Sequence, residues 1–379
     1  MIYLNNAATS FPKPLQVVEA LKSVIETPPF HNARMGFERE AFDVITECRK
    51  LLCDLFNGED YNRIIFTSNA TESLNLIING LDLKGKHVVT TVVEHNSVLR
   101  PLKTLEREKA INITIVDCDE FGFIQPKNVI NAIKKNTACV IINHCSNVTG
   151  TINDLYSIGK VAKMKGIPFV VDASQSAGII PIDIKKMNID FLAFTGHKSL
   201  YGIQGIGGAY IGEKVRLRPL IIGGTGVRSD YLFQPEELPI YYEAGTPNIP
   251  GIFALNEGIK FVLEKGIDNI FAHKIHLIEL MRKHLSEKRR IKIYPGIKCN
   301  QPTTVFSFNI GGISPDDVGY MLENMFNIIV RSGLHCAPLI HKHIGTSPAG
   351  SVRVSPSYFT TEKEISVFSN AIDEICNIS

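Results

Sequence analysis

Short apolar runs alternate with amphipathic stretches over much of this chain. The runs are four or five residues long, are rich in β-branched and aromatic side chains, and do not alternate with polar residues. This pattern predicts strands that are buried on both faces of a sheet. The predicted strands lie at 63–67, 87–91, 112–116, 138–142, 168–172 and 191–194.

The stretches between these runs carry apolar residues at helical spacing, as in the series Leu74, Ile77, Ile78 and Leu81. Strand and helix in regular alternation predict a parallel sheet with helical crossovers. The alternation continues from about residue 60 to 212 and ends in a Gly- and Pro-rich passage. We therefore expect an α/β fold over this part of the chain.

The pattern changes after residue 250. Lys and Glu alternate with apolar residues over 252–288, which is typical of two long helices with a solvated face. Shorter elements follow in mixed order, which indicates a separate α+β domain. We predict strands near 291–294, 303–309 and 327–331, and helices near 315–325 and from 361.

Charge and cysteine usage narrow the class of protein. The 379 residues carry 40 basic and 38 acidic side chains, a net charge of +2 that gives nucleic acid or an anionic membrane nothing to attract. No apolar run approaches the roughly 18 residues of a membrane span, and the N-terminus lacks a signal-peptide pattern. The eight cysteines form no C-x-x-C pair, which argues against a zinc ribbon or disulfide framework. We expect a cytoplasmic protein with reduced cysteines and no metal site.

Polar residues follow five of the predicted strands at the point where each strand ends. In an open parallel sheet the ligand crevice lies beyond these carboxyl ends, so the segments are expected to converge. Any one of them has an ordinary explanation, such as a helix N-cap at Ser68 or Asn69. The five segments are 67–72, 94–97, 143–150, 172–178 and 195–199.

The converging residues supply one group for each need of pyridoxal phosphate. Lys198 offers an amine for a Schiff base with the aldehyde, and Asp172 offers an acid to keep the pyridine nitrogen protonated. His95 offers a flat ring to cover the cofactor, and the turn at 68–71 offers hydroxyls and amides for the phosphate. Taken alone, an Asp or a Lys at such a place is more often part of a buried ion pair or a charge at the rim of the sheet.

Longer motifs make a family resemblance plain. The chain resembles fold-type I pyridoxal phosphate enzymes of the class V aminotransferase family and, within it, the cysteine desulfurases. A Thr-Gly-His-Lys motif that follows Asp-Ala-Ser-Gln at the family's spacing is the most specific of these matches. The matching segments are 5–9, 70–72, 94–95, 146–150, 171–175, 195–198, 243–248, 331–337 and Arg353.

The resemblance implies a fold and a division into domains. It predicts a large domain with a mostly parallel seven-stranded sheet that binds pyridoxal 5'-phosphate. It also predicts a smaller C-terminal α+β domain that carries the catalytic cysteine and the substrate arginine. The implied boundaries are 1–14 for an N-terminal segment that packs on the small domain, 15–250 for the large domain and 251–379 for the small one.

The resemblance also assigns roles by position. Lys198 would hold the cofactor and move the substrate's α-proton, Asp172 would pair with the pyridine nitrogen, and His95 would stack on the ring. The remaining matches would bind the phosphate, the phenolic oxygen or the substrate. They are Ala70, Thr71, Thr195 and His197 at the phosphate, Thr246 reaching it from the partner of a homodimer, Asn147 and Gln175 near the phenolic oxygen, and Arg353 with Asn147 at the substrate carboxylate.

Cys336 distinguishes the possible activities. It lies in a polar loop beside His335, where the matching cysteine of desulfurases attacks the substrate sulfur. The implied reaction converts L-cysteine to L-alanine and leaves a persulfide on Cys336 for a sulfur-acceptor protein. The compact loop also resembles the group that includes selenocysteine lyases. A C–S lyase or aminotransferase, and a non-enzymatic protein that retains the cofactor, remain alternatives.

The sequence His341-Lys342-His343 is a weaker signal near Cys336. Two histidines at this spacing could be metal ligands. No second cysteine or carboxylate is close in sequence, so we expect solvated histidines on a helix instead.

Overall fold

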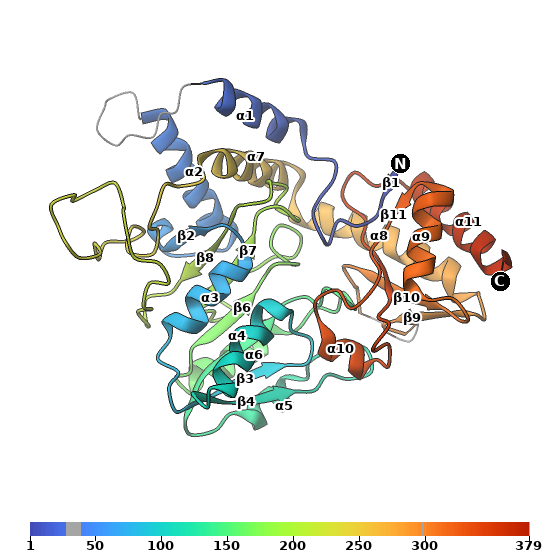
Figure 1. Ribbon diagram of the computed structural model, residues 1–379, viewed down its shortest axis with the longest axis horizontal. Helices are drawn as coiled ribbons and strands as arrows, with labels where there is room; N and C mark the ends of the chain where they lie inside the picture. The colour runs from blue at the N-terminus through green and yellow to red at the C-terminus, as the bar shows by residue number, and fades with distance from the viewer. Residues whose placement is uncertain (28–38, 297–298, 300, 379) are drawn as a thin grey trace.

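A seven-stranded sheet and a three-stranded sheet form the framework of the protein (Figure 1). The structure, a computed structural model, describes residues 1–27, 39–296, 299 and 301–378. Strand β8 is antiparallel to both of its neighbours in the large sheet, and the other strands pair in parallel. In spatial order the large sheet contains β2 (Ile64–Thr67), β8 (Gly207–Ile211), β7 (Phe191–Thr195), β6 (Phe169–Asp172), β5 (Thr137–Asn143), β3 (Lys86–Thr91) and β4 (Ile111–Val116).

These strands confirm the expected α/β fold with a mostly parallel seven-stranded sheet. Six of them coincide with the predicted strands, and their ends differ by at most one residue. Both faces of the sheet are buried, as the apolar runs predicted. In β5, Val140 and Ile142 belong to one hydrophobic cluster, whereas Cys139 and Ile141 belong to the cluster on the opposite face.

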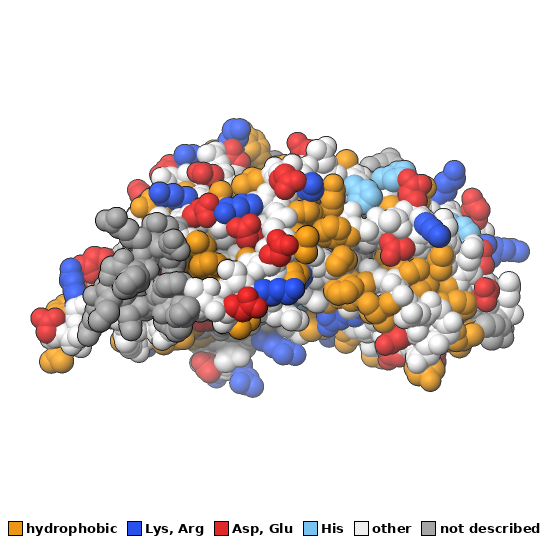
Figure 2. Space-filling model, turned by 90° about the horizontal axis from the view of Figure 1, so that it is seen from above, with side chains coloured by type: hydrophobic (Ala, Val, Ile, Leu, Met, Phe, Trp, Pro, Cys, Tyr) orange, Lys and Arg blue, Asp and Glu red, His pale blue; other side chains and the backbone are white. Residues whose placement is uncertain are grey.

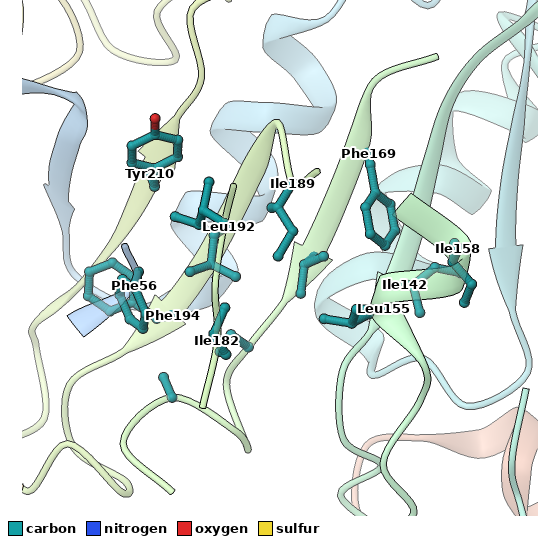
Figure 3. Packing of buried hydrophobic residues seen from close by; sticks show 14 of the residues in the cluster. Phe56, Ile142, Leu155, Ile158, Phe169, Ile182, Ile189, Leu192, Phe194 and Tyr210 are labelled. Atoms are coloured by element: carbon teal, nitrogen blue, oxygen red, sulfur yellow. The ribbon is translucent and has the colours of Figure 1, made fainter. Parts of the chain in front are cut away.

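Helices cover the two faces of the large sheet. Figure 3 shows Leu155 and Ile158 of one helix beside Phe169 of β6, and Phe56 beside Phe194 of β7. The helices on this face are α2 (Arg39–Leu55), α5 (Pro126–Ala132), α6 (Leu155–Met164) and α7 (Ile249–Lys265), and α1 (Leu15–Glu26) packs on α7. The other face is covered by α3 (Ala70–Gly80) and α4 (Asn96–Arg107).

The second sheet has a hydrophobic cluster of its own. It is antiparallel, with β10 (Phe306–Ile310) between β12 (Val352–Val354) and β9 (Ile291–Tyr294). Strand β1 (Ile2–Tyr3) pairs with β11 (Ile328–Ile329), so both chain ends lie in this smaller part (Figure 1). The accompanying helices are α8 (Ile267–Ser286), α9 (Pro315–Phe326) and α11 (Glu362–Ile378). The short helix α10 (Pro338–His343) instead packs on the cluster of the large sheet through Ile340.

Helix α7 begins at Ile249, close to the predicted domain boundary at 250/251. Its residues Ile252, Leu255 and Ile259 belong to the cluster of the large sheet, so the helix packs with the larger part of the molecule. The division of the chain into domains at residues 14 and 250 stays a prediction.

The surface in Figure 2 carries acidic and basic side chains intermixed rather than gathered by sign. This distribution is consistent with the small net charge of +2. Within the described residues, no helix is both long enough and apolar enough to cross a membrane.

Candidate functional site

The carboxyl ends of three central strands bring together the first predicted site residues. Asp172 is the last residue of β6 and lies in register with Asn143 at the end of β5, while Lys198 follows β7. Asp172 is buried, and its Oδ1 accepts hydrogen bonds from the amide (2.9 Å) and hydroxyl (2.5 Å) of Ser174. These donors fix the carboxylate and leave its Oδ2 without a donor from the described residues, available to a ligand.

The Lys198 amine is shielded by protein, although part of the side chain reaches solvent. Burial lowers the pKa of Lys198 to about 8, and the negative charge of Asp172 opposes that shift. An amine with this pKa loses its proton more readily than an exposed lysine, as a nucleophile must. Cys336 and Arg353 also act electrostatically on Lys198, so the smaller part of the molecule contributes to its surroundings.

His95 is the N-cap of α4 and is half-buried beside the same charges. Its Nδ1 accepts a hydrogen bond from the Ser97 amide at 3.1 Å. Burial lowers the pKa of His95 to about 4, while the charge of Asp172 opposes the shift and that of Lys198 adds to it. The imidazole is therefore neutral at neutral pH, which suits a ring that stacks on a cofactor.

The residues predicted to hold the phosphate meet at the start of α3. Asn69 caps this helix, and no described residue accepts a hydrogen bond from the amides of Ala70 and Thr71. Thr195 pairs with Gly207 of β8, and a Cβ placed on Gly207 would lie 2.8 Å from the Cα of Asn69. The end of β7 therefore lies beside the start of the helix. The Thr195 hydroxyl and the His197 Nδ1 are buried without a hydrogen-bond partner. Unpaired donors at a helix N-terminus fit a phosphate group.

Arg353 of β12 is fully buried between the two parts of the molecule. Its guanidinium donates to the backbone oxygen of Asn147 at 3.0 Å and to Oδ1 of Asn5 at 3.3 Å, and its Nε has no partner. Burial, reinforced by the nearby charge of Arg331, lowers the pKa of Arg353 to about 9. No carboxylate is bonded to this guanidinium in the described residues, so it can receive one from a ligand.

Cys336 lies on a short loop between β11 and α10, and it is exposed. The Arg331 guanidinium lies 3.8 Å from its Sγ, and the backbone oxygen of Cys336 accepts a hydrogen bond from the Asn96 amide at 2.7 Å. The loop is thereby fixed next to His95. All eight cysteines are described; five of them are buried, and only Cys336 is exposed.

The backbone around Cys336 adopts an uncommon conformation. His335 and Cys336 have φ values of +48° and +58°, which are unfavourable for residues with a Cβ. The backbone at Gly350 packs directly on this loop, because a Cβ at Gly350 would lie 2.2 Å from the carbonyl carbon of Gly333. Asn147, a predicted substrate residue, also holds this loop, because its Nδ2 donates to the backbone oxygen of His335 at 2.7 Å.

The N-terminal segment crosses from the small sheet to the Lys198 loop. The His197 oxygen accepts hydrogen bonds from the Ser10 amide (3.0 Å), the Ser10 hydroxyl (3.1 Å), the Thr9 hydroxyl (3.2 Å) and the Lys13 amine (3.1 Å). Four donors on one carbonyl hold the peptide that directly precedes Lys198. Gln175 is placed by the same segment, since its Nε2 donates to the Ala7 oxygen at 3.0 Å.

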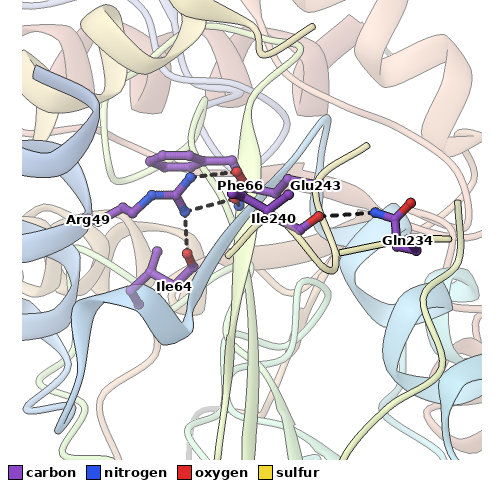
Figure 4. A network of polar contacts seen from close by, with 6 residues as sticks. All are labelled: Arg49, Ile64, Phe66, Gln234, Ile240 and Glu243. Atoms are coloured by element: carbon purple, nitrogen blue, oxygen red, sulfur yellow. Dashed lines mark hydrogen bonds and ion pairs between the residues drawn. The ribbon is translucent and has the colours of Figure 1, made fainter. Parts of the chain in front are cut away.

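Thr246 is the predicted site residue that this chain does not bring to the others. It is exposed in a long connection between β8 and α7. Figure 4 shows how the connection is anchored. Both carboxylate oxygens of Glu243 accept hydrogen bonds from the Arg49 guanidinium, at 2.8 and 2.5 Å. Glu243 also accepts from the Phe66 amide at 2.6 Å, which ties the connection to β2.

Three basic residues of this region were not singled out by the sequence patterns. Arg331 lies within the matched segment 331–337, and this match could have identified it as a site residue. Lys13 has no such signal. Lys274 was expected on a solvated helix face, but it is only 5% exposed, because this part of α8 packs between the two parts of the molecule.

The expectation of solvated histidines at 341 and 343 is wrong for His341. This side chain is fully buried, and its Nδ1 is hydrogen-bonded to the Thr346 hydroxyl at 2.7 Å. Its ring packs beside that of His335, with centroids 5.4 Å apart. Among the described residues, no three His, Cys, Asp or Glu side chains are grouped to hold a metal ion.

The fold and the site at the strand ends are those of one class of protein, and comparison with known proteins identifies the family. The aminotransferase class-V model matches residues 2–368, so the chain belongs to the aminotransferase class-V family. This confirms the resemblance that the motifs predicted.

The similar proteins fall within one part of that family. A probable cysteine desulfurase of Pyrococcus abyssi is 35% identical over 385 residues, covering 99% of this chain and 94% of the relative. One of Methanothermobacter thermautotrophicus is 33% identical over 394 residues, covering 100% and 95%.

Solved structures agree with these relatives. The apo structure of a cysteine desulfurase from Thermococcus onnurineus has a TM-score of 0.92 at 33% identity, covering 100% of this chain and 95% of that chain. The cysteine desulfurase CsdA of Escherichia coli has a TM-score of 0.89 at 25% identity, covering 99% and 94%. The prediction of a desulfurase-like enzyme is therefore confirmed at the level of family and fold.

Proposed function

We propose that this protein is a cysteine desulfurase that uses pyridoxal 5'-phosphate to convert L-cysteine to L-alanine. The observation that carries the proposal is the meeting of Lys198, Arg353 and the exposed Cys336 at one site. The cofactor, when bound, would withdraw electrons from the bonds at the substrate's α-carbon.

The residues of this chain would divide the remaining work. Lys198 would hold the cofactor covalently and move a proton at its Nζ. Asp172 Oδ2 would face the pyridine nitrogen, His95 would cover the ring, and Gln175 and Asn147 would lie near the phenolic oxygen. The phosphate would be held by Ala70, Thr71, Thr195 and His197.

Arg353 and Cys336 would act on the substrate. The guanidinium of Arg353 can grip the substrate carboxylate through two nitrogens, which a lysine cannot do. Cys336 Sγ would take the substrate sulfur and become a persulfide, leaving alanine. The guanidinium of Arg331 lies 3.8 Å from this sulfur and would hold it at the site.

Replacement of Cys336 by Ser tests the proposal. The purified holoenzyme is incubated with L-cysteine and a thiol reductant, which releases the persulfide sulfur as sulfide, and alanine and sulfide are measured. We expect Cys336→Ser to lose alanine formation while it keeps the absorbance band of the bound cofactor. The buried Cys145→Ser is the matched control and should keep activity. Unchanged turnover in Cys336→Ser would remove the persulfide role.

A selenocysteine lyase is the second candidate, and the short Cys336 loop favours it. The loop between β11 and α10 is fixed by Asn96 and lies close to the strand ends. The same assay with L-selenocysteine separates the two activities. Selenide release retained in Cys336→Ser, with sulfide release lost, would favour the lyase.

The proposed enzyme would act as a homodimer in which Thr246 reaches the partner's phosphate site. Support comes from the connection that carries Thr246, because it exposes large apolar side chains. They include Ile222 (69% exposed), Leu232 (93%) and Phe233 (74%). A sulfur-acceptor protein would receive the persulfide sulfur. The cytoplasmic location stays a prediction.

A further inference from the structure

A small cavity lies behind the Lys198 segment, between the two parts of the molecule. The space that the centre of a water molecule can occupy in this cavity is about 10 Å³. Its walls come from the N-terminal segment, the residues after Lys198, helix α8 and the segment after β12. Polar members of the lining are Asn6, Ser10, Lys198, Ser199, Tyr201, Lys274, Ser357 and Tyr358.

Lys274 contributes a buried amine to this cavity. The side chain is 5% exposed, and no described residue forms a hydrogen bond or ion pair with its Nζ. An unpaired ammonium group inside a protein is costly, so such groups are paired, solvated or deprotonated. Burial lowers the pKa of Lys274 to about 8, which still leaves most of the amines charged at neutral pH.

The surroundings do not supply a counter-ion. No carboxylate is among the residues that line the cavity. The groups that act electrostatically on Lys274 are the Arg353 guanidinium, which is a like charge, and the Cys145 thiol. The Cys145 thiol is neutral, since burial raises its pKa to about 11. The cavity therefore carries the positive charge of Lys274, with the like charge of Arg353 nearby and no counter-charge among its lining residues.

The cavity is separate from the proposed cofactor site. Of the residues assigned to the cofactor, only Lys198 lines it, and Asp172, His95 and the start of α3 do not. The cofactor would thus leave Lys274 without a partner.

We propose that this cavity is a binding site for one small monovalent anion of the halide class, held by Lys274. The volume suits a ligand about the size of one water molecule and excludes carboxylates, sulfate and phosphate. A halide accepts hydrogen bonds from ammonium and hydroxyl groups and needs no fixed geometry. Bound there, it would link α8 to the N-terminal segment and the Lys198 loop. The proposal does not depend on the desulfurase activity.

Bromide can locate the site, because it scatters X-rays anomalously. We expect crystals of the full-length holoenzyme grown in bromide to show an anomalous peak within about 3.5 Å of the Lys274 Nζ. Lys274→Met, which keeps the length and loses the charge, should lose the peak. Lys283→Met, an exposed lysine of the same helix, should keep it. A cavity that holds only water in bromide-grown wild-type crystals would overturn the proposal.

A second measurement needs only the wild-type protein. A ligand that binds the native state alone raises its stability. At equal ionic strength we expect a higher Tm in sodium chloride than in sodium gluconate, whose anion is too large for the cavity. The difference should persist in Lys283→Met and vanish in Lys274→Met where that variant folds. Equal wild-type Tm values in the two salts would contradict the proposal.

Discussion

At the scale of single residues, Glu94 is a buried carboxyl next to the proposed cofactor site. Its Oε1 accepts hydrogen bonds from the Thr91 hydroxyl (2.6 Å) and the Asn143 amide (3.0 Å), while its Oε2 has no partner. Burial raises the pKa of Glu94 from 4.5 to about 8, and the charge of Asp172 contributes to the shift. The carboxyl is therefore neutral in the folded protein at neutral pH.

This protonation makes stability depend on pH. Below pH 4.5 both the folded and the unfolded chain hold the proton; between 4.5 and about 8 only the folded chain holds it. The Glu94 contribution is thus fully present at low pH and is lost as the pH rises, by up to ~1.4 kcal/mol per pH unit. We expect Glu94→Gln, a neutral mimic, to gain stability relative to wild type as the pH goes from 5 to 8.

Urea unfolding at several pH values measures this difference. Glu120→Gln changes an exposed carboxyl and should follow the wild-type pH dependence. Parallel curves for wild type and Glu94→Gln would show that Glu94 is ionised in the folded state.

Lys13 is a positioning residue for the Lys198 loop. Its amine donates to the Ser10 hydroxyl at 2.7 Å and to the His197 oxygen at 3.1 Å. A hydrogen bond from a charged group contributes about 1.5–3 kcal/mol. We expect Lys13→Met to speed the release of pyridoxal phosphate by about tenfold or more, measured as the decay of cofactor absorbance after dilution into a trapping reagent.

Two further variants separate positioning from general destabilisation. Lys13→Arg keeps the charge and should restore slow release. Lys22→Met, an exposed lysine of α1, should release the cofactor at the wild-type rate. If Lys13→Arg released cofactor as fast as Lys13→Met, the charge on this side chain would have no positioning role.

The sequence predicts some of these residues and not others for a physical reason. Asp172 closes an apolar run and Lys198 comes four residues after another, so their place at the strand ends follows from local pattern. Lys274 lies four residues after Ile270 and three before Leu277, so helical spacing places it on the apolar face of α8. Its lack of a partner depends on packing between distant segments, which no pattern within α8 reveals.

At the scale of elements, the same contrast holds for strands and connections. The six strands with β-branched runs were predictable, whereas β8 begins with Gly207 and Gly208 and has no apolar run of that kind. Close packing against the neighbouring strand β2 fixes the position of β8, since a Cβ at Gly208 would lie 2.6 Å from the Ile65 oxygen. Likewise, nothing near Arg49 in sequence indicates its pairing with Glu243.

The Arg49–Glu243 pair anchors the connection that carries Thr246. The two side chains are 7% and 19% exposed, and Glu243 also holds the Phe66 amide. Glu243→Gln leaves the Arg49 guanidinium buried without a counter-charge, so we expect a loss of ~3–5 kcal/mol in the free energy of unfolding. The double variant Arg49→Met/Glu243→Gln should lose less, because it leaves no unpaired charge.

Urea unfolding of these variants gives the comparison. The exposed pair Arg216–Glu236 is the control, with exposures of 56% and 70%, and Glu236→Gln should change stability little. A double variant less stable than Glu243→Gln would contradict the assigned cause.

At the scale of the whole molecule, the connection between β8 and α7 projects away from the large sheet (Figure 1). It exposes Leu232 and Phe233, and the Gly245 amide bonds the Gly224 oxygen at 2.7 Å, which joins the apolar stretch to the Thr246 end. Exposed apolar side chains in this number are typical of a surface that a partner covers. The proposed homodimer would bury them and bring Thr246 to the partner's site together.

We therefore expect Leu232→Asp/Phe233→Asp to yield a monomer, whereas the wild type has the mass of two chains by light scattering. The monomer should also retain pyridoxal phosphate less well, since Thr246 would no longer reach the partner's phosphate site. Met164→Asp alters a side chain that is 78% exposed on α6 and should stay dimeric. A wild type with the mass of one chain would contradict the shared site, and a double variant that stays dimeric would place the interface elsewhere.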